Sequence, residues 1–242
     1  DMNGPQFELV AIRGMAVNFD GGGHVIDNFR ISDKKTKLDI DPQEGTVEIY
    51  LGLFADAESI KNLGIGKRAT ITYHGGSKYT VSVYVGGIAA GANLIDNCHS
   101  DATITIKGDG DTRVGGVVGD CSFLTNSYHR GSIVVNGTVI DSEAKNKRGR
   151  IEPGKLRVGG VSVWVNKKIS GCYNTGSITV KSSGALLLIG GVSAETVGAV
   201  SSDLYNKGSI RLTADGDIKN ARIGGLLGAG CTTSKMPFQK EK

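Results

Sequence analysis

Apolar residues occur along the chain in short runs that end at glycine, asparagine or serine. No segment keeps apolar residues at the 3.6-residue period of an amphipathic helix over a useful length. The runs have the length of β-strands instead, and the residues that bound them favour turns. The pattern therefore predicts an all-β protein built from many short strands.

Two short phrases recur along the chain. The first has two glycines between aliphatic residues, and its copies lie at 85–88, 114–117, 158–161, 189–192 and 223–226, with a looser copy at 51–54. The second contains Gly-Ser-Ile, and its copies lie at 127–135, 170–180 and 204–212. The first glycines of the first phrase are at 52, 86, 115, 159, 190 and 224. Repeats at this spacing indicate a solenoid, a propeller or a similar array.

The strand pattern within one repeat decides between these architectures. A propeller blade needs four longer strands in about 40–45 residues, whereas each repeat here offers three short strands in roughly 30 residues. That pattern suits one coil of a parallel β-helix, in which equivalent residues of neighbouring coils lie about 4.8 Å apart and form ladders. We therefore expect a single-domain parallel β-helix, or β-solenoid, of about six to seven irregular coils.

Aligning the repeats assigns residues to columns that run along the stack. A corner column, in which a buried asparagine would bond the backbone of the next coil, contains Asn28, Asn62, Asn97, Asn126, Gly171 and Asp203. An aliphatic core column contains Ile104, Ile133, Ile178 and Ile210. A second inward column contains Cys98, Ser127, Cys172 and Leu204. The repeated glycines are expected to permit a left-handed backbone at the corners.

A column of aromatic residues follows the second inward column by one residue, so strand alternation turns it outward. Its members are His99, Tyr128, Tyr173 and Tyr205, and they are our candidate ligand-binding residues. Rings with an apolar body and a polar tip suit sugars and protein interfaces. The alternative is that the rings stack on one another and brace the coils. The only tryptophan, Trp164, either packs over a gap in the core or protrudes.

The columns also bear on the four cysteines, at 98, 121, 172 and 231, which form no C-x-x-C pair. Cys98 and Cys172 are two coils apart, roughly 9–10 Å, and disulfides need Cα atoms within about 7 Å. Cys121 and Cys231 are three coils apart. The alignment thus predicts four free thiols, mostly buried.

The glycine phrases resemble the GLUG motif, which is repeated in arrays in large bacterial surface proteins. The matching residues include Val114-Gly115-Gly116-Val117-Val118-Gly119, Ile223-Gly224-Gly225-Leu226-Leu227-Gly228 and the stretch 19–28, F-D-G-G-G-H-V-I-D-N. The resemblance covers about residues 14–230. It implies an exported protein of the bacterial cell surface or extracellular space with an adhesin-like role. Relatives also include IgA-specific metallopeptidases, but their H-E-x-x-H sequence does not occur here.

The same alignment divides the chain into regions. We expect an N-terminal cap at 1–18, GLUG-like β-helix repeats at 19–230 and a polar tail at 231–242. Insertions at about 33–49 and 136–157 should leave the coils as loops or hairpins. The second insertion carries Lys145, Lys147, Arg148 and Arg150. Such a charge run is either a solvated loop or a contact for an anionic glycan or lipid surface.

Composition narrows the range of partners. Glycine makes up 37 of 242 residues while proline is scarce, which indicates many tight turns and not a disordered chain. The net charge of +4 is mild, and we expect no nucleic-acid partner. No apolar run approaches the ~18 residues of a transmembrane helix. No leader opens the sequence, so either it is absent or this is a mature or trimmed form, and export rests on the resemblance. We expect no cofactor and no metal, because the acidic stretches at 39–44 and 109–111 lack the spacing of a calcium loop.

Catalysis by a β-helix on polysaccharides needs carboxylates gathered on one face of neighbouring coils. No such cluster is found along the columns, because Thr125 and Arg130 replace Asp96 and Asp101 in the next coil. An ice-binding array of Thr-x-Thr is interrupted at Val134 and Arg211. The sequence favours a non-enzymatic extracellular surface module with adhesin-like binding of a host or bacterial glycan or surface protein. The alternatives are a rigid structural spacer of a larger surface protein and a polysaccharide-active β-helix enzyme. Ligand identity and oligomeric state stay open.

Overall fold

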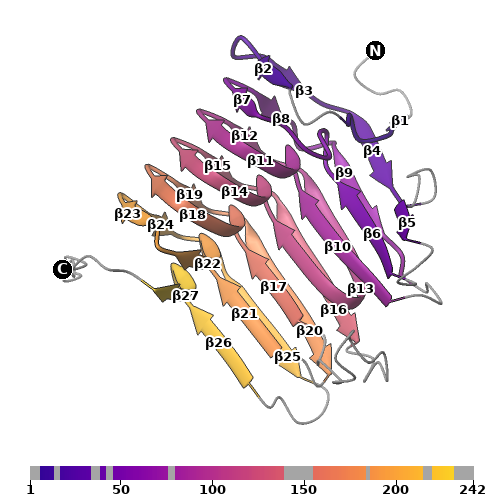
Figure 1. Ribbon diagram of the computed structural model, residues 1–242, viewed down its shortest axis with the longest axis vertical. Helices are drawn as coiled ribbons and strands as arrows, with labels where there is room; N and C mark the ends of the chain where they lie inside the picture. The colour runs from indigo at the N-terminus through magenta and orange to yellow at the C-terminus, as the bar shows by residue number, and fades with distance from the viewer. Residues whose placement is uncertain are drawn as a thin grey trace.

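The computed structural model describes residues 6–13, 17–33, 39–41, 46–75, 80–138, 155–183, 186–214 and 220–231. Across these residues the chain is all β and forms a parallel β-helix, so the predicted fold class is confirmed. Figure 1 shows the coils stacked in chain order from the indigo N-terminal end to the yellow C-terminal end. No helical segment in the described part of the chain has the length and hydropathy needed to cross a bilayer.

Four ladders of strands, parallel except for β5, form the sides of the helix, and we number them in the order in which a repeat visits them. Sheet 1 contains β5 (Asp39–Asp41), β6 (Thr46–Leu51), β10 (Thr80–Gly86), the second half of β13 (Thr103–Gly115), β17 (Lys155–Gly159), β21 (Leu186–Gly190) and β26 (Asn220–Gly224). Sheet 2 contains β2 (Asn18–Asp20), β7 (Ser59–Lys61), β11 (Ala89–Asp96), β14 (Val118–Thr125), β18 (Ser162–Ser170), β22 (Ser193–Val197), β23 (Val200–Ser202) and β27 (Leu227–Cys231).

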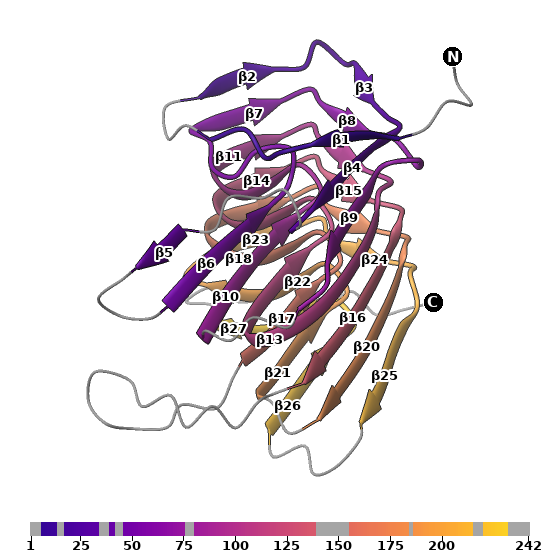
Figure 2. The same cartoon turned by 90° about the vertical axis from the view of Figure 1, so that its right-hand side faces the viewer.

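Sheets 3 and 4 complete each coil. Sheet 3 contains β3 (Val25–Ile26), β8 (Gly64–Ile65), β12 (His99–Ser100), β15 (Tyr128–His129), β19 (Tyr173–Asn174) and β24 (Tyr205–Asn206). Sheet 4 contains β1 (Phe7–Leu9), β4 (Phe29–Ser32), β9 (Thr70–Tyr73), the first half of β13, β16 (Ser132–Thr138), β20 (Ser177–Ser183) and β25 (Ile210–Ala214). Strand β13 belongs to sheets 4 and 1 and joins them (Figure 2). The strands from β6 to β25 make five complete coils, with partial coils at either end.

The core columns lie where the alignment of the repeats placed them. Ile104, Ile133, Ile178 and Ile210 are in register along sheet 4, and the first three are fully buried. The column of Cys98, Ser127 and Cys172 is also buried, and Leu204 packs against the core from the end of the column. Burying an aliphatic side chain stabilises the fold by about 1.5–3 kcal/mol in each coil. A one-residue slip would turn that side chain to the outer face, so its burial fixes the register.

The corner column has the predicted position but not the predicted bonding. Asn28, Asn62, Asn97, Asn126 and Asp203 all have positive φ, and Gly171 continues the column with φ 64°. Asparagine tolerates this left-handed conformation better than most residues. The predicted burial is wrong, however, because Asn97 and Asn126 are exposed. Their amides bond side chains of the preceding coil, Asn97 to Asn62 at 2.7 Å and Asn126 to Asp96 at 3.0 Å, instead of the backbone.

The glycines of the first phrase serve close packing instead of a left-handed turn, which corrects the expectation from the sequence. A Cβ on Gly160 would overlap the carbonyl oxygen of Gly191 and the side chain of Asn174. Gly116 and Gly191 are enclosed in the same way, by His129 and Asn206 respectively and by the carbonyl of the next coil. The phrase recurs because each copy lies directly against the next copy and against an inward side chain of sheet 3.

That inward column of sheet 3 is apolar at Ile26 and Ile65 and becomes polar in the later coils, at Ser100, His129, Asn174 and Asn206. Asn174 is fully buried and makes two hydrogen bonds to the backbone of Gly176. Its Nδ2 donates to the carbonyl oxygen at 3.0 Å, and the Gly176 N–H donates to its Oδ1 at 3.1 Å. Asn206 makes the same pair of bonds to Gly208. His129 is fully buried, and neither ring nitrogen makes a hydrogen bond with the described residues.

Parts of the two expected insertions form strands. Residues 39–41 and 46–51 form β5 and β6, which pair antiparallel at the edge of sheet 1. Residues 136–138 extend β16, and residues 155–157 begin β17, so both stretches belong to the coils. The rest of that insertion, with all four of its candidate basic residues, lies outside the described residues.

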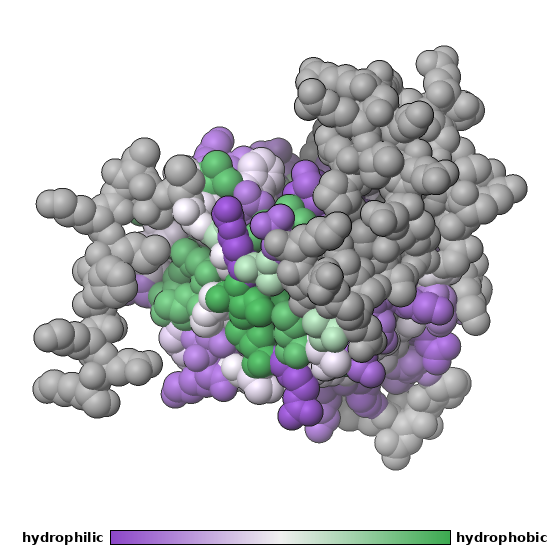
Figure 3. Space-filling model, turned by 90° about the horizontal axis from the view of Figure 1, so that it is seen from below, coloured by the Kyte–Doolittle hydropathy of each residue, from purple (hydrophilic) through white to green (hydrophobic). Residues whose placement is uncertain are grey.

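The described ends of the stack differ from its middle. At the N-terminal end, β1 pairs with β4 and extends sheet 4. In the last coils, Val197, Val200, Ile223 and Leu226 are between 41% and 59% exposed. Figure 3, seen from below, shows apolar side chains gathered on this face of the molecule. An uncovered β edge with apolar side chains is prone to association.

The described thiols should be unreactive in the folded protein. Cys98, Cys121 and Cys172 are free and buried. Burial raises the pKa of Cys98 and of Cys172 to about 11, so little thiolate forms at pH 8. In a Cys231→Ser variant, a colorimetric disulfide reagent should label fewer than about one thiol in an hour, and three after denaturant is added. Rapid labelling without denaturant would show that these columns are accessible to solvent.

Candidate functional site

The aromatic column forms the stacked ladder that strand register dictates. His99, Tyr128, Tyr173 and Tyr205 are directly paired along sheet 3. Successive ring centroids are 5.0, 4.6 and 4.6 Å apart, and the ring planes lie within 8° of parallel. We call these four residues the ring ladder. The structure therefore brings all four candidate residues together.

The faces of these rings are mostly covered by neighbouring groups. Each inner ring has another ring on both sides, and the guanidinium of Arg130 lies 5.0 Å from the Tyr128 ring centroid. Arg130 is itself held by two hydrogen bonds to Asp101, at 2.8 and 2.7 Å. A sugar ring stacks on an aromatic face, and the ladder offers mainly edges. The geometry favours the bracing role for these residues.

A second surface with more suitable chemistry lies at the corner between sheets 1 and 2. Outward side chains of sheet 1 meet outward side chains of sheet 2 there, because the two-glycine phrase turns one sheet sharply into the other. Arg113 of β13 donates to Asp120 of β14 across this corner. We call the surface the Trp164 groove and define it by Arg113, Asp120, Arg157, Trp164, Asn166 and Glu195.

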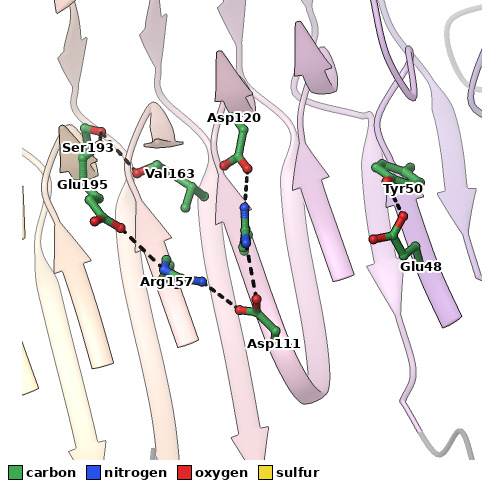
Figure 4. Close-up of polar contacts among 9 residues, drawn as sticks. Glu48, Tyr50, Asp111, Asp120, Arg157, Val163, Ser193 and Glu195 are labelled. Atoms are coloured by element: carbon green, nitrogen blue, oxygen red, sulfur yellow. Dashed lines mark hydrogen bonds and ion pairs between the residues drawn. The ribbon is translucent and has the colours of Figure 1, made fainter. Parts of the chain in front are cut away.

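A network of ion pairs crosses the groove from coil to coil (Figure 4). Asp111 accepts from Arg157 at 2.8 Å and lies 3.4 Å from Arg113. Arg157 approaches Glu195 of the next coil at 3.6 Å. Each of these arginines is thus shared between two carboxylates, which fixes their side chains along the stack.

The network is largely removed from solvent. The side chains of Arg113, Asp120 and Arg157 are 23%, 21% and 13% exposed. Burial raises the pKa of Asp120, although the neighbouring Arg113 and Arg157 act in the opposite direction. Several polar atoms of the groove make no hydrogen bond with the described residues, namely Nε of Arg113, Nε of Arg157, Oδ1 of Asp120 and Oδ1 of Asn166. Buried polar atoms without partners are costly, and a small shift of these side chains would let a ligand or water bond them.

Trp164 lies at the centre of the groove, on β18. It pairs with Asp120 on one side and Glu195 on the other along sheet 2. Its ring is half-buried and packs against a small apolar cluster of Val163, Leu188 and Ala194, outside the main core. Of the two alternatives drawn from the sequence, the residue therefore packs, but on the outer surface of the coil.

Two pockets adjoin Trp164. One, of about 260 Å³, is lined by Arg113, Arg157, Val163, Glu195 and Val197 in addition to Trp164. The other, of about 360 Å³, extends over sheet 2 toward Asp56, Glu58, Asn93, Asp120 and Asn166. An aromatic side chain between two pockets with convergent polar groups is the usual composition of a small-ligand site.

Aromatic residues continue along sheet 1 beside the groove. Tyr50 and Tyr84 stack with ring centroids 5.0 Å apart. The guanidinium of Arg113 lies 4.8 Å from the Tyr84 ring centroid and carries the stack into the ion network. This row of rings and arginines gives the groove an extended polar wall.

Sequence reasoning did not find this site. Asp111, Arg113 and Asp120 are close in the sequence, but their contact depends on how sharply the glycine phrase turns. The available signal was an outward Arg at the same place in two successive repeats, Arg113 and Arg157, with carboxylates in register beside them. Among the described residues no group of histidine, cysteine or acidic side chains could hold a metal ion.

Comparisons of this chain with protein-family models, with curated proteins and with solved structures find no match. The site is therefore interpreted from its own residues.

Proposed function

We propose that this protein is a non-enzymatic binding module that holds a glycan in the Trp164 groove. The observation that carries the proposal is the position of Trp164 between two pockets whose lining side chains include polar atoms that are buried without partners among the described residues. Sugars combine apolar ring faces with many hydroxyl groups, and they suit an aromatic side chain flanked by fixed polar groups.

A binding role suits the groove better than a catalytic one. Asp111, Asp120 and Glu195 each lie beside an arginine that holds them in place. A general acid and base for glycoside cleavage need two carboxyl groups facing each other across the scissile bond, with one free to carry a proton. The groove instead provides a rigid, preformed surface, which favours binding without a conformational cost.

The resemblance to GLUG-motif arrays supports an adhesin-like role at the bacterial cell surface or in the extracellular space. In this proposal the stacked coils are the rigid support and the groove is the ligand site. A spacer without a ligand of its own is the alternative, and it predicts no binding that depends on Trp164.

Replacing Trp164 tests this function. Trp164→Ala should lower binding to the glycans recognised on an array by at least about 30-fold, as expected when a central aromatic contact worth about 2 kcal/mol is lost. The matched control is Tyr128→Ala/Tyr173→Ala in the ring ladder, which should bind normally if the variant is folded by circular dichroism. Binding lost only in the ladder variant would move the site to the ladder. No binding by the native chain to glycans would favour the spacer.

A further inference from the structure

We infer that the ligand of the Trp164 groove is an uncharged oligosaccharide of at least two sugar rings, one on each side of Trp164. This inference rests on the proposed function and adds the class of ligand to it. Three features of the groove carry it, which are its division into two pockets, its charge and its unpartnered polar atoms.

The division of the groove sets the minimum length of the ligand. The two pockets, of about 260 and 360 Å³, share Trp164 as a common wall. Sites for whole drug-sized ligands range from about 300 to 1,000 Å³, and the two pockets lie at or below the lower end of that range, so each is suited to a small unit. A ligand that uses both pockets must cross the Trp164 side chain, and a chain of linked sugar rings does so.

The charge of the groove disfavours anionic sugars. Asp111, Asp120 and Glu195 outnumber Arg113 and Arg157, and the arginines are already paired with them. The larger pocket adds Asp56 and Glu58, and no lysine or arginine is among its lining residues. A uronate or sialate carboxylate would therefore face like charges without a free cation, which disfavours its binding.

The unpartnered atoms point to hydroxyl groups. Beside the pockets two donors, Nε of Arg113 and Nε of Arg157, and two acceptors, Oδ1 of Asp120 and Oδ1 of Asn166, are buried without partners among the described residues, and a small shift of these side chains would bring them to a ligand. Nε of Arg157 is 3.6 Å from Glu195, which is beyond hydrogen-bond reach. An ammonium group only donates and a carboxylate only accepts, whereas a hydroxyl does both. A sugar with several hydroxyls satisfies both kinds of atom at once.

The test is calorimetry of the full chain with neutral oligohexosides of one to six rings, and with oligogalacturonates and glucosamine oligomers of the same lengths. We expect Trp164-dependent binding to be confined to the neutral series. Its affinity should rise at least tenfold from one ring to three and change less than twofold between roughly 0.05 and 0.5 M NaCl.

A variant on one side of Trp164 tests the two-pocket arrangement. Asn166→Ala removes an acceptor that bonds nothing in the described structure, so folding should be unaffected. It should lower the affinity for the three-ring ligand about tenfold. Trp164-dependent binding of the charged series alone, or equal affinity for one and three rings, would overturn this inference and leave the proposed function in place. Binding that is absent from every series or independent of Trp164 would overturn both.

Discussion

The native protein should lose stability as the pH falls from about 6.5 to 4, and His129→Asn should abolish most of that loss. Burial lowers the pKa of His129 from 6.5 to about 4, and a distant contribution from Asp101 and an approach to the backbone of Ser100 only partly offset it. In the unfolded chain His129 is therefore protonated below about pH 6.5, whereas in the folded chain it is protonated only below about pH 4. The free energy of unfolding falls through this window as the pH falls, by about 3 kcal/mol at ~1.4 kcal/mol per pH unit.

Asparagine is the matched replacement because the next two coils have it in the same column. Asn174 and Asn206 bond the backbone of the glycine two residues on, and Gly131 occupies that place beyond His129. The variant should be about as stable as the native chain at pH 7, since it removes two buried ring nitrogens that make no hydrogen bond with the described residues.

Urea unfolding at pH 7, 6, 5 and 4 measures this effect. The control is His24→Asn, which removes an exposed histidine from the surface. If the variant at 129 kept the native slope of stability against pH, the acid sensitivity would arise elsewhere in the molecule.

Gly160→Ala should destabilise the fold by about 3 kcal/mol, at the upper end of the usual cost of overpacking. A methyl group there would overlap the backbone of the next coil and the buried side chain of Asn174, and neither can move without breaking ladder hydrogen bonds. Chemical denaturation of the two proteins, with the midpoint and slope compared, measures the change.

Gly225 provides a matched control from the same column. It is the second glycine of the last copy of the phrase, and a Cβ there would meet nothing within 4 Å. Gly225→Ala should therefore change stability by less than about 0.5 kcal/mol. Equal effects of the two substitutions would mean that the cost comes from the glycine backbone itself and not from the contact between coils.

The fold was accessible from the sequence because each column repeats a physical requirement. Residues such as Ile133 and Cys172 occur at positions that must face inward in every coil, so spacing alone revealed their register. The outward stack of Tyr128 on Tyr173 followed from the same register. The role of the two-glycine phrase was misjudged because two different requirements both select glycine. A close contact with a side chain such as Asn174 and a left-handed turn look the same in the sequence.

The groove was not accessible in the same way. Its ion pairs join Arg113 to Asp120 and Arg157 to Glu195, and they form because sheet 2 turns back toward the outer surface of sheet 1. The repeats give the positions of these residues along the chain but not the angle between the two sheets. Trp164 occurs once, so no column identified its direction.

The most direct test of the account is the fluorescence of Trp164, the only tryptophan of the chain. With excitation at a wavelength that selects tryptophan, neutral oligosaccharides of increasing concentration are added to the native protein. The account predicts a saturable change in emission whose midpoint matches the affinity from calorimetry. Calorimetric binding of the same ligand with unchanged Trp164 emission would contradict the claim that the ligand occupies this groove.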